Sequence, residues 1–407
     1  MKALSDIAHS IGSRLVLLIA TLGTVLLHSH FLGESGLGSI ALLQFGLLLV
    51  TGMAGFVAAG AVVFVRRSHK PSQLRKVAYA WCMFSAIVAA GLGTAAGIIP
   101  REWLVASAVL GLMQSTIVFH SQLLIAGGSI RTNNQLQIVQ TISLLASTSI
   151  TYLYFEITTP TGFMWALAAA LSVALVFSIA AMKDAWQSAP TSGVHDPSSA
   201  TPLLFRYGSQ GSTGSILQLL TNRANLSLLN HFIGTAGAGV YSVVYYGVEA
   251  VWTVARALAP MVNTEVAAAT SSVERRTITN RYLKKTMVLT VPLSIIASAV
   301  PESFYAWVFG INGIALPLQI LCPGMIAGAI SSIIAHHLSA IGLHVWNART
   351  SAIGLAVLVG LGWFTVPKYG VAGAAVAASA AYLSQAAGLI YALLKEDPKV
   401  NERPPAF

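Results

Sequence analysis

About twelve apolar runs, each long enough to cross a lipid bilayer, follow one another along the chain with short connections. A membrane-crossing helix needs about 20 mainly apolar residues, whereas the alternating strands of membrane β-barrels are only about 10 residues long. We therefore predict an all-α membrane protein with about twelve transmembrane helices. Their expected ranges are 10–30, 38–65, 77–98, 103–127, 135–157, 162–182, 206–233, 238–262, 286–306, 315–341, 350–366 and 370–394.

Composition supports this interpretation, because 55% of the residues are hydrophobic and only 9% are charged. An ordinary soluble domain carries about 25% charged residues. The chain therefore belongs with integral membrane proteins rather than with large soluble domains.

A motif near residue 30 recurs near residue 231, with six identical positions at a constant offset of 201 residues. The motif His30–Gly33 with Gly36, Gly38 and Gly46 aligns with His231–Gly234, Gly237, Gly239 and Gly247. This repeat predicts two six-helix lobes. Because six helices separate the copies, both lobes keep one orientation, and we expect a pseudo-twofold axis along the membrane normal.

The longest polar segment lies where the two copies should join. It contains Ser188–Gly193 and Asp196–Ser199, which are rich in proline and small polar residues. Such a composition is typical of a flexible linker. We therefore expect an N-terminal lobe at 1–190, a cytoplasmic linker at 191–205, and a C-terminal lobe with a cytoplasmic tail at 206–407.

Basic residues indicate the orientation in the membrane. If both termini are cytoplasmic, only Arg101 and Lys368 fall on the outer side, Arg223 and Arg256 fall inside the membrane, and the other Lys and Arg side chains fall on the inner side. This distribution follows the positive-inside rule. It also accounts for the net charge of +10, so the charge does not point to a nucleic-acid partner.

Polar residues inside the membrane mark the seventh and eighth expected helices as the functional region. The seventh carries eleven polar residues between positions 210 and 230, which are Gln210, Ser212, Thr213, Ser215, Gln218, Thr221, Asn222, Arg223, Asn225, Ser227 and Asn230. Lipid penalises such a helix, so much of it should face protein or a watery cavity. At about 1.5 Å per residue, Arg223 lies near the middle of the bilayer.

The eighth expected helix brings Tyr245, Glu249, Thr253 and Arg256 to one face. Two interpretations of its charges are open. Arg223 and Glu249 could neutralise each other as a structural pair, which would leave Arg256 without an acidic partner. Alternatively, Arg223 and Arg256 form a cationic cavity for an anionic substrate. Arg14, near the inner end of the first helix, could likewise reach the lipid headgroups or contact substrate.

Motifs of enzymes and cofactor-binding proteins are missing from the sequence. There is no phosphate-binding glycine loop that ends in Lys-Ser/Thr, no metal-spaced His/Glu cluster on one helix, and no nucleophile elbow. We therefore expect no catalytic residue, no metal site and no cofactor.

Several stretches resemble the bacterial polysaccharide (O-antigen type) flippases of the multidrug/oligosaccharidyl-lipid/polysaccharide exporter superfamily. They are Arg206–Gly208, Thr221–Asn225, Phe232–Ser242, Pro323-Gly324 with Ala340–Gly342, and Tyr369–Ala375. In that pattern an acidic residue often follows the arginine of the seventh helix by two positions. This chain has Asn225 there.

The resemblance implies two lobes that alternate between inward and outward openings in the bacterial inner membrane. The implied substrate is an undecaprenyl-pyrophosphate-linked oligosaccharide, and the implied partners are membrane lipids and polysaccharide assembly proteins. Arginine can bind a diphosphate through two hydrogen bonds. The candidate substrate-binding residues are Arg223, Arg256, Arg14, Glu249, Gln218, Asn222, Asn225, Tyr245 and Tyr246.

Two other functions compete with glycan export. A drug or cation antiporter of the same superfamily would use carboxylates at the membrane centre, and Glu249 is the one convincing candidate in the sequence. A membrane glycan polymerase or ligase would need a sizeable outer loop with catalytic groups, and the outer segments expected here are short. Resistance to cationic dyes and glycan elongation by the purified protein would identify these alternatives.

Overall fold

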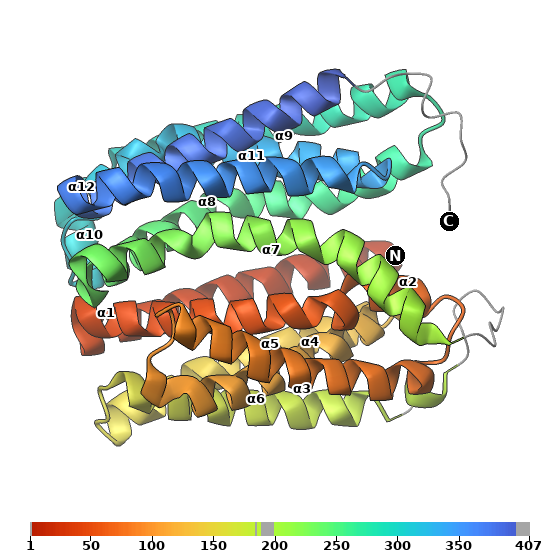
Figure 1. Cartoon of the computed structure of the whole chain (residues 1–407), viewed down its shortest axis with the longest axis horizontal. Coiled ribbons are helices and arrows are strands. Elements are labelled where there is room, and N and C mark those ends of the chain that lie inside the picture. The colour runs from red at the N-terminus through yellow and green to blue at the C-terminus, as the bar shows by residue number, and fades with distance from the viewer. Residues whose placement is uncertain (1, 184, 189–198, 396–407) are drawn as a thin grey trace. The chain divides into compact units, whose positions relative to one another are not determined.

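The computed structural model describes residues 2–183, 185–188 and 199–395, and for 2–15, 18, 187 and 210 it describes the backbone only (Figure 1). This part of the chain is helical and contains no strand. The α-helices are α1 Lys2–Ala58, α2 Gly60–Val65, α3 Pro71–Ala95, α4 Leu104–Ala126, α5 Ile130–Ser149, α6 Pro160–Ala181, α7 Ala200–Ile233, α8 Thr235–Ala268, α9 Ser272–Ala299, α10 Glu302–Phe309, α11 Ala315–Ala340 and α12 His344–Leu394.

The two longest helices, α1 and α12, are each interrupted by one glycine. Gly33 interrupts α1 with φ 62° and ψ −170°, and Gly370 interrupts α12 with φ 57° and ψ −129°. An L side chain at such a positive φ would be strained, which is why glycine stands at both breaks. Each helix therefore provides two membrane segments, as the expected ranges 10–30 with 38–65 and 350–366 with 370–394 predict. Figure 1 shows the chain doubling back within α1 and within α12.

The backbone at the repeated motif has the same shape in both copies. Gly234, which the offset of 201 aligns with Gly33, has φ 85° and ψ −179° between α7 and α8. The next aligned pair also matches, because a Cβ on Gly36 would lie 2.6 Å from Leu32, and a Cβ on Gly237 would lie 2.3 Å from Ile233. The same type of glycine turn, at Gly33 and at Gly234, therefore occurs in both halves of the sequence.

Contacts divide the chain into two compact units, Met1–Ile216 (unit 1) and Leu217–Phe407 (unit 2). The boundary falls within α7, whose first half packs in unit 1. There a Cβ on Gly208 would lie 1.5 Å from the backbone oxygen of Phe56, so only glycine permits this approach. Of the expected linker at 191–205, residues up to 198 lie outside the described part, and α7 begins at Ala200.

Each unit packs its helices through an apolar core of its own. In unit 1, α1 contacts α3, α4 and α5, while α6 packs on α4 and α5. In unit 2, α11 is central and contacts α8, α9 and α12. Large apolar side chains such as Trp165 (71% exposed) and Val176 (69% exposed) point away from the core, as expected for a surface that faces lipid.

Within the described residues, seven helices are long and apolar enough to cross a membrane, or eight if α9 and α10 count as one broken span. Two of these seven are the doubled helices α1 and α12. Helices α7 and α8, each 34 residues long, do not pass that test, because their polar residues lower their hydropathy. The structure also agrees with the expected twelve segments. Helices α1 and α12 contribute two segments each, and α3 to α9 and α11 contribute one segment each. The protein is therefore an all-α membrane protein.

The ninth expected span differs from the structure. The sequence predicts one helix over 286–306, but α9 ends at Ala299 and α10 leaves it at an angle of 86°. Pro301 precedes α10 in an extended conformation, with ψ 154°, and proline disfavours helical geometry in the residue before it. At its other end α9 begins at Ser272, whose neighbour Ser271 accepts a hydrogen bond from the Glu274 amide. A helix can extend beyond the apolar stretch that hydropathy detects.

Candidate functional site

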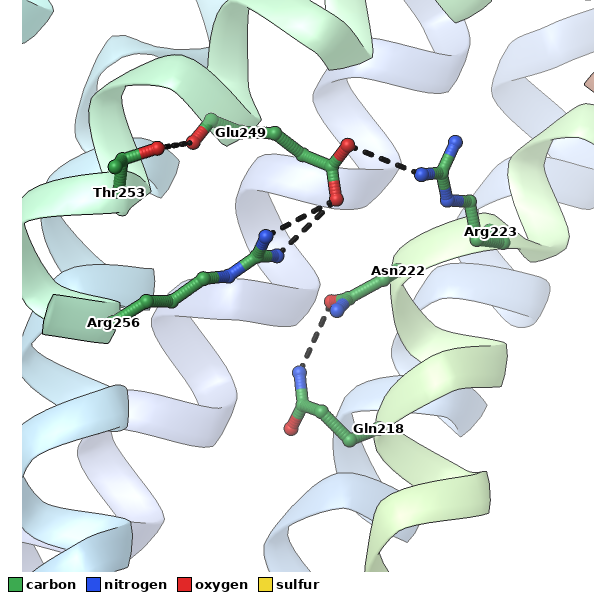
Figure 2. A network of polar contacts seen from close by, with 6 residues as sticks. All are labelled: Gln218, Asn222, Arg223, Glu249, Thr253 and Arg256. Atoms are coloured by element: carbon green, nitrogen blue, oxygen red, sulfur yellow. Dashed lines mark hydrogen bonds and ion pairs between the residues drawn. The ribbon is translucent and has the colours of Figure 1, made fainter. Parts of the chain in front are cut away.

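Two arginines share one carboxylate in unit 2. Arg223 of α7 donates from Nη2 to Oε2 of Glu249 on α8 at 3.2 Å. Arg256, two turns further along α8, donates from Nη1 and Nη2 to the other oxygen, Oε1, at 3.3 Å. Figure 2 shows the carboxylate between the two guanidinium groups. With two cations and one anion, this cluster has a formal charge of +1.

The two arginines differ in exposure. The Arg223 side chain is 13% exposed, that of Glu249 is 26% exposed, and that of Arg256 is 47% exposed. A guanidinium carries five N–H donors, and Arg256 uses only two of them on Glu249. Arg223 is therefore the fixed member of the cluster, and Arg256 presents donors that a ligand can reach.

An aromatic ring lies against each of the two guanidinium groups. The Cζ atom of Arg223 lies 4.1 Å from the centre of the Tyr245 ring, and that of Arg256 lies 5.9 Å from the Trp252 ring. A cation over an aromatic face is attracted by the ring quadrupole. The Trp252 indole is itself fixed, because its Nε1 donates to the Met325 oxygen on α11 at 2.8 Å. Gly328 leaves room for that indole, since a Cβ there would come within 2.3 Å of it.

The turn at Gly234 explains why these groups meet. It joins α7 directly to α8, so the chain runs toward the turn in one helix and away from it in the next. Arg223 lies 11 residues before this glycine and Glu249 lies 15 residues after it. At about 1.5 Å per residue, the two side chains differ by little more than one helical turn in depth, which a long arginine can span.

Next to the charged cluster lies an uncharged network of amides and a hydroxyl. Gln218 donates from Nε2 to Oδ1 of Asn222 at 3.0 Å, as Figure 2 shows. The Gln218 oxygen accepts from Ser351 at 3.1 Å and also from Gln385, both on α12. Gln385 donates to Ser351 as well, at 3.0 Å. This network connects α7 to both halves of α12 and lines one side of the charged cluster with polar groups.

Two of the candidate residues, Asn225 and Tyr245, connect α7 to α8. Asn225 is 1% exposed and donates from Nδ2 to the Tyr241 hydroxyl at 2.8 Å and to the Ala374 oxygen at 3.0 Å. Tyr245 is 2% exposed and lies under Arg223. Tyr246 is partly buried on the next position of α8. Asn225 and Tyr245 are thus positioned to orient the site rather than to meet a ligand directly.

The structure corrects one sequence-based interpretation and leaves one residue outside the described side chains. The sequence left Arg256 without an acidic partner, but Arg256 binds the same carboxylate as Arg223. The spacing of seven residues between Glu249 and Arg256, two helical turns, is the signal that predicts this contact. Arg14 lies in α1, where the structure describes the backbone only.

Sequence reasoning missed Trp252, Ser351 and Gln385. Trp252 lies one turn from Glu249 and Arg256 on α8, so its place beside the site follows from helical spacing. Ser351 and Gln385 lie more than 130 positions further along the chain than Gln218. No local pattern connects them with Gln218, because only the packing of α12 against α7 brings them together.

No protein-family model and no curated protein matches the sequence. Solved structures do resemble the fold. A multidrug resistance MATE family transporter of the MOP superfamily, in an inward-facing conformation, matches with a TM-score of 0.68 and 12% identity, covering 94% of this chain and 96% of its own. The lipid II flippase MurJ, in an inward closed conformation, matches with a TM-score of 0.68 and 13% identity, covering 96% of this chain and 88% of its own.

A third similar structure is a MOP superfamily transporter from Pyrococcus furiosus, with a TM-score of 0.59, 12% identity and coverage of 96% of this chain and 94% of its own. MOP abbreviates the exporter superfamily named above. Identities this low establish the fold alone. The chain has the fold of MOP superfamily transporters, and these similar proteins are transporters and flippases rather than enzymes.

Proposed function

We propose that the chain is a flippase or exporter that moves an undecaprenyl-pyrophosphate-linked oligosaccharide across the bacterial inner membrane by alternating access, with both termini in the cytoplasm. The observation that carries this proposal is the cluster of Arg223, Glu249 and Arg256, which holds two guanidinium groups on one carboxylate. Charges within membrane segments are costly and mark substrate or ion pathways. An excess of positive charge favours an anion there.

The chemistry of the site fits a diphosphate. Each guanidinium offers paired N–H groups that match two oxygens of a phosphate. In the proposed bound state the diphosphate approaches the more exposed Arg256 first and competes with Glu249 for the donors of both arginines. The lipid tail stays in the bilayer, so the protein needs to surround only the polar part of the substrate.

The amide network fits the sugar part of the same substrate. Gln218 and Asn222 are partly buried rather than sealed, and amides both donate to and accept from sugar hydroxyls. Tyr245 supports Arg223 in this proposal, because its ring is covered by the guanidinium. Arg14 is a third proposed contact of the diphosphate.

A direct test measures translocation of a fluorescent polyprenyl-diphosphate disaccharide in proteoliposomes. Removing one charge-assisted contact costs about 1.5–3 kcal/mol, so we expect Arg223→Ala and Arg256→Ala each to lower the rate roughly tenfold to a hundredfold. Arg349→Ala is the matched control, because Arg349 lies 5.7 Å from the Trp346 ring much as Arg256 lies 5.9 Å from Trp252. No ion pair among the described residues involves Arg349.

Normal glycan translocation by both alanine variants, at normal protein levels, would show that the assignment is wrong. Expression in a dye-sensitive strain tests the competing function of a drug or cation antiporter, which the similarity to a MATE transporter and the presence of Glu249 favour. The two arginines on Glu249 oppose it, because a cationic drug would have to displace both to reach the carboxylate. Resistance to cationic dyes that disappears in Glu249→Gln would establish the antiporter instead.

A further inference from the structure

A basic hollow lies on α9, away from the candidate site. Its volume is about 480 Å³, and its lining comes from one face of the helix, namely Thr277, Asn280, Arg281, Lys284 and Lys285. These positions are spaced by three, one, three and one residues, as side chains on one side of an α-helix are. Arg281, Lys284 and Lys285 therefore place three cations in the hollow within little more than one turn of α9.

In the part of the chain that the structure describes, one carboxylate forms an ion pair with these cations. Arg281 forms an ion pair with Glu265 of α8, and its Cζ lies 5.4 Å from the Tyr282 ring. Tyr282 in turn donates its hydroxyl proton to Glu265 at 2.5 Å. None of the ion pairs among the described residues involves Lys284 or Lys285, although Lys285 lies 5.5 Å from the Tyr282 ring. The formal charge around the hollow is therefore +2.

The hollow ends where the apolar surface of α9 begins. Val288, one turn beyond Lys284 and Lys285, is 71% exposed, and Leu289 is 52% exposed. Ile295 and Ile296, two turns further on, are 54% and 61% exposed. Arg281, Lys285, Val288 and Ile295 follow one another at helical spacing, so cationic and apolar parts form one continuous face. This order of groups matches a phospholipid, with its phosphate next to its acyl chains.

We propose that the hollow binds the phosphate of an anionic glycerophospholipid, whose acyl chains lie along Val288 and Ile295. Lys284 and Lys285 supply the free charge, Arg281 is held in place by Glu265, and Asn280 offers an amide donor. A dissolved phosphate would use the hollow but not the apolar face above it. The lipid belongs to the leaflet nearest the start of α9, which the charge distribution predicts to be cytoplasmic. This site does not depend on the transported substrate.

Lipid retention by the full-length protein tests the proposal. The protein is reconstituted in phosphatidylcholine with a minor share of phosphatidylglycerol, extracted in mild detergent, and examined by native mass spectrometry. A basic residue near an anionic surface contributes about a fivefold factor, so Lys284→Ala with Lys285→Ala should lower retention of phosphatidylglycerol about 30-fold. Lys284→Arg with Lys285→Arg should restore it. The matched control is Lys70→Ala with Lys76→Ala, which removes the same charge from exposed positions at the start of α3.

Three outcomes of the phosphatidylglycerol measurement would overturn the proposal. They are equal retention by the alanine variant and the wild type, an equal loss in the control variant, and displacement of the lipid by millimolar inorganic phosphate, which would indicate a site for the free ion. Retention of undecaprenyl diphosphate in place of phosphatidylglycerol would also overturn it, because the hollow would then be a loading site for substrate. None of these measurements requires transport, so a failure here is separate from a failure of the proposed function.

Discussion

The two copies of the repeated motif share a backbone turn but differ in the side chains that they place around it. Gly33 and Gly234 have nearly the same positive φ and extended ψ. The offset of 201 residues, extended along the adjoining helices, gives unit 1 uncharged residues at the three charged positions of unit 2. Leu22 stands at the position of Arg223, Leu48 at that of Glu249, and Gly55 at that of Arg256.

This difference separates the requirements of the fold from those of the site. Both copies need a glycine that reverses the chain, whatever the helices carry. Leu22 and Leu48 are 48% and 37% exposed, so apolar side chains are tolerated at the first two positions. Elsewhere in unit 1, Gln140 of α5 donates to Gln114 of α4 at 2.7 Å, so this pair of polar side chains is uncharged. The glycine turn therefore forms without charged residues on the adjoining helices, and Arg223, Glu249 and Arg256 are particular to unit 2.

The largest expected effect comes from giving unit 2 the residue of unit 1 at the carboxylate. Glu249→Leu would leave Arg223 and Arg256 close together without a counter-ion, and breaking a buried pair costs about 3–5 kcal/mol. Because all three side chains keep some exposure, we expect a loss of about 3 kcal/mol in the free energy of unfolding. Thermal unfolding in detergent would measure this loss as a clearly lower melting temperature. Glu249→Gln should lose less, and an unchanged melting temperature for Glu249→Leu would contradict the prediction.

The second expected effect tests whether the turn serves both copies equally. Gly33→Ala and Gly234→Ala each place a Cβ in a backbone region that is almost restricted to glycine, at a cost of roughly 1–3 kcal/mol. We expect the two losses in unfolding free energy to agree within about 1 kcal/mol. Gly91→Ala in α3 is the control, because a Cβ there meets no atom within 4 Å. That variant should be neutral or slightly more stable, since alanine favours a helix. Unequal costs would show that the turns are not equivalent.

The smallest expected effect concerns the shape of the exposed cation. Arg256→Lys keeps the charge but loses the two N–H groups that reach Oε1 of Glu249. Lysine acts as a point charge without a planar fork, so we expect about a fivefold slower translocation, equivalent to about 1 kcal/mol. The proteoliposome assay described above would measure this decrease in the translocation rate. A rate as low as that of Arg256→Ala would mean that charge alone does not sustain the function.

Much of the fold could be predicted from the sequence, because the signals are local. The motif His30–Gly33 identifies the turn, and apolar runs identify the segments to within several residues. The ends of helices are less predictable, since hydropathy records the apolar stretch and not the helix. Helix α8 thus extends to Ala268, six residues beyond the expected end at 262, and α9 begins 14 residues before 286. The bend at Pro301 joins two helices that hydropathy reads as one span.

The candidate site was predictable only in part. Arg223 and Glu249 could be paired from their similar depth on consecutive helices. The second bond of Glu249, to Arg256, follows from helical spacing once the carboxylate is allowed two partners. Ser351 and Gln385 could not be found in this way, because α12 reaches Gln218 through tertiary packing alone. Long-range contacts of uncharged side chains leave no periodic trace in a single sequence.

The Tyr245 ring gives the Arg223 guanidinium a favourable contact that does not depend on Glu249. The guanidinium touches a carboxylate on one side and an aromatic face on the other, 4.1 Å away. In the bound state proposed above, an anion would replace Glu249 while the attraction between Arg223 and the Tyr245 ring persists, so the guanidinium would keep one favourable contact throughout. Under that proposal, Arg223 would keep its position while its counter-ion changes, which would lower the energetic barrier to substrate binding and release.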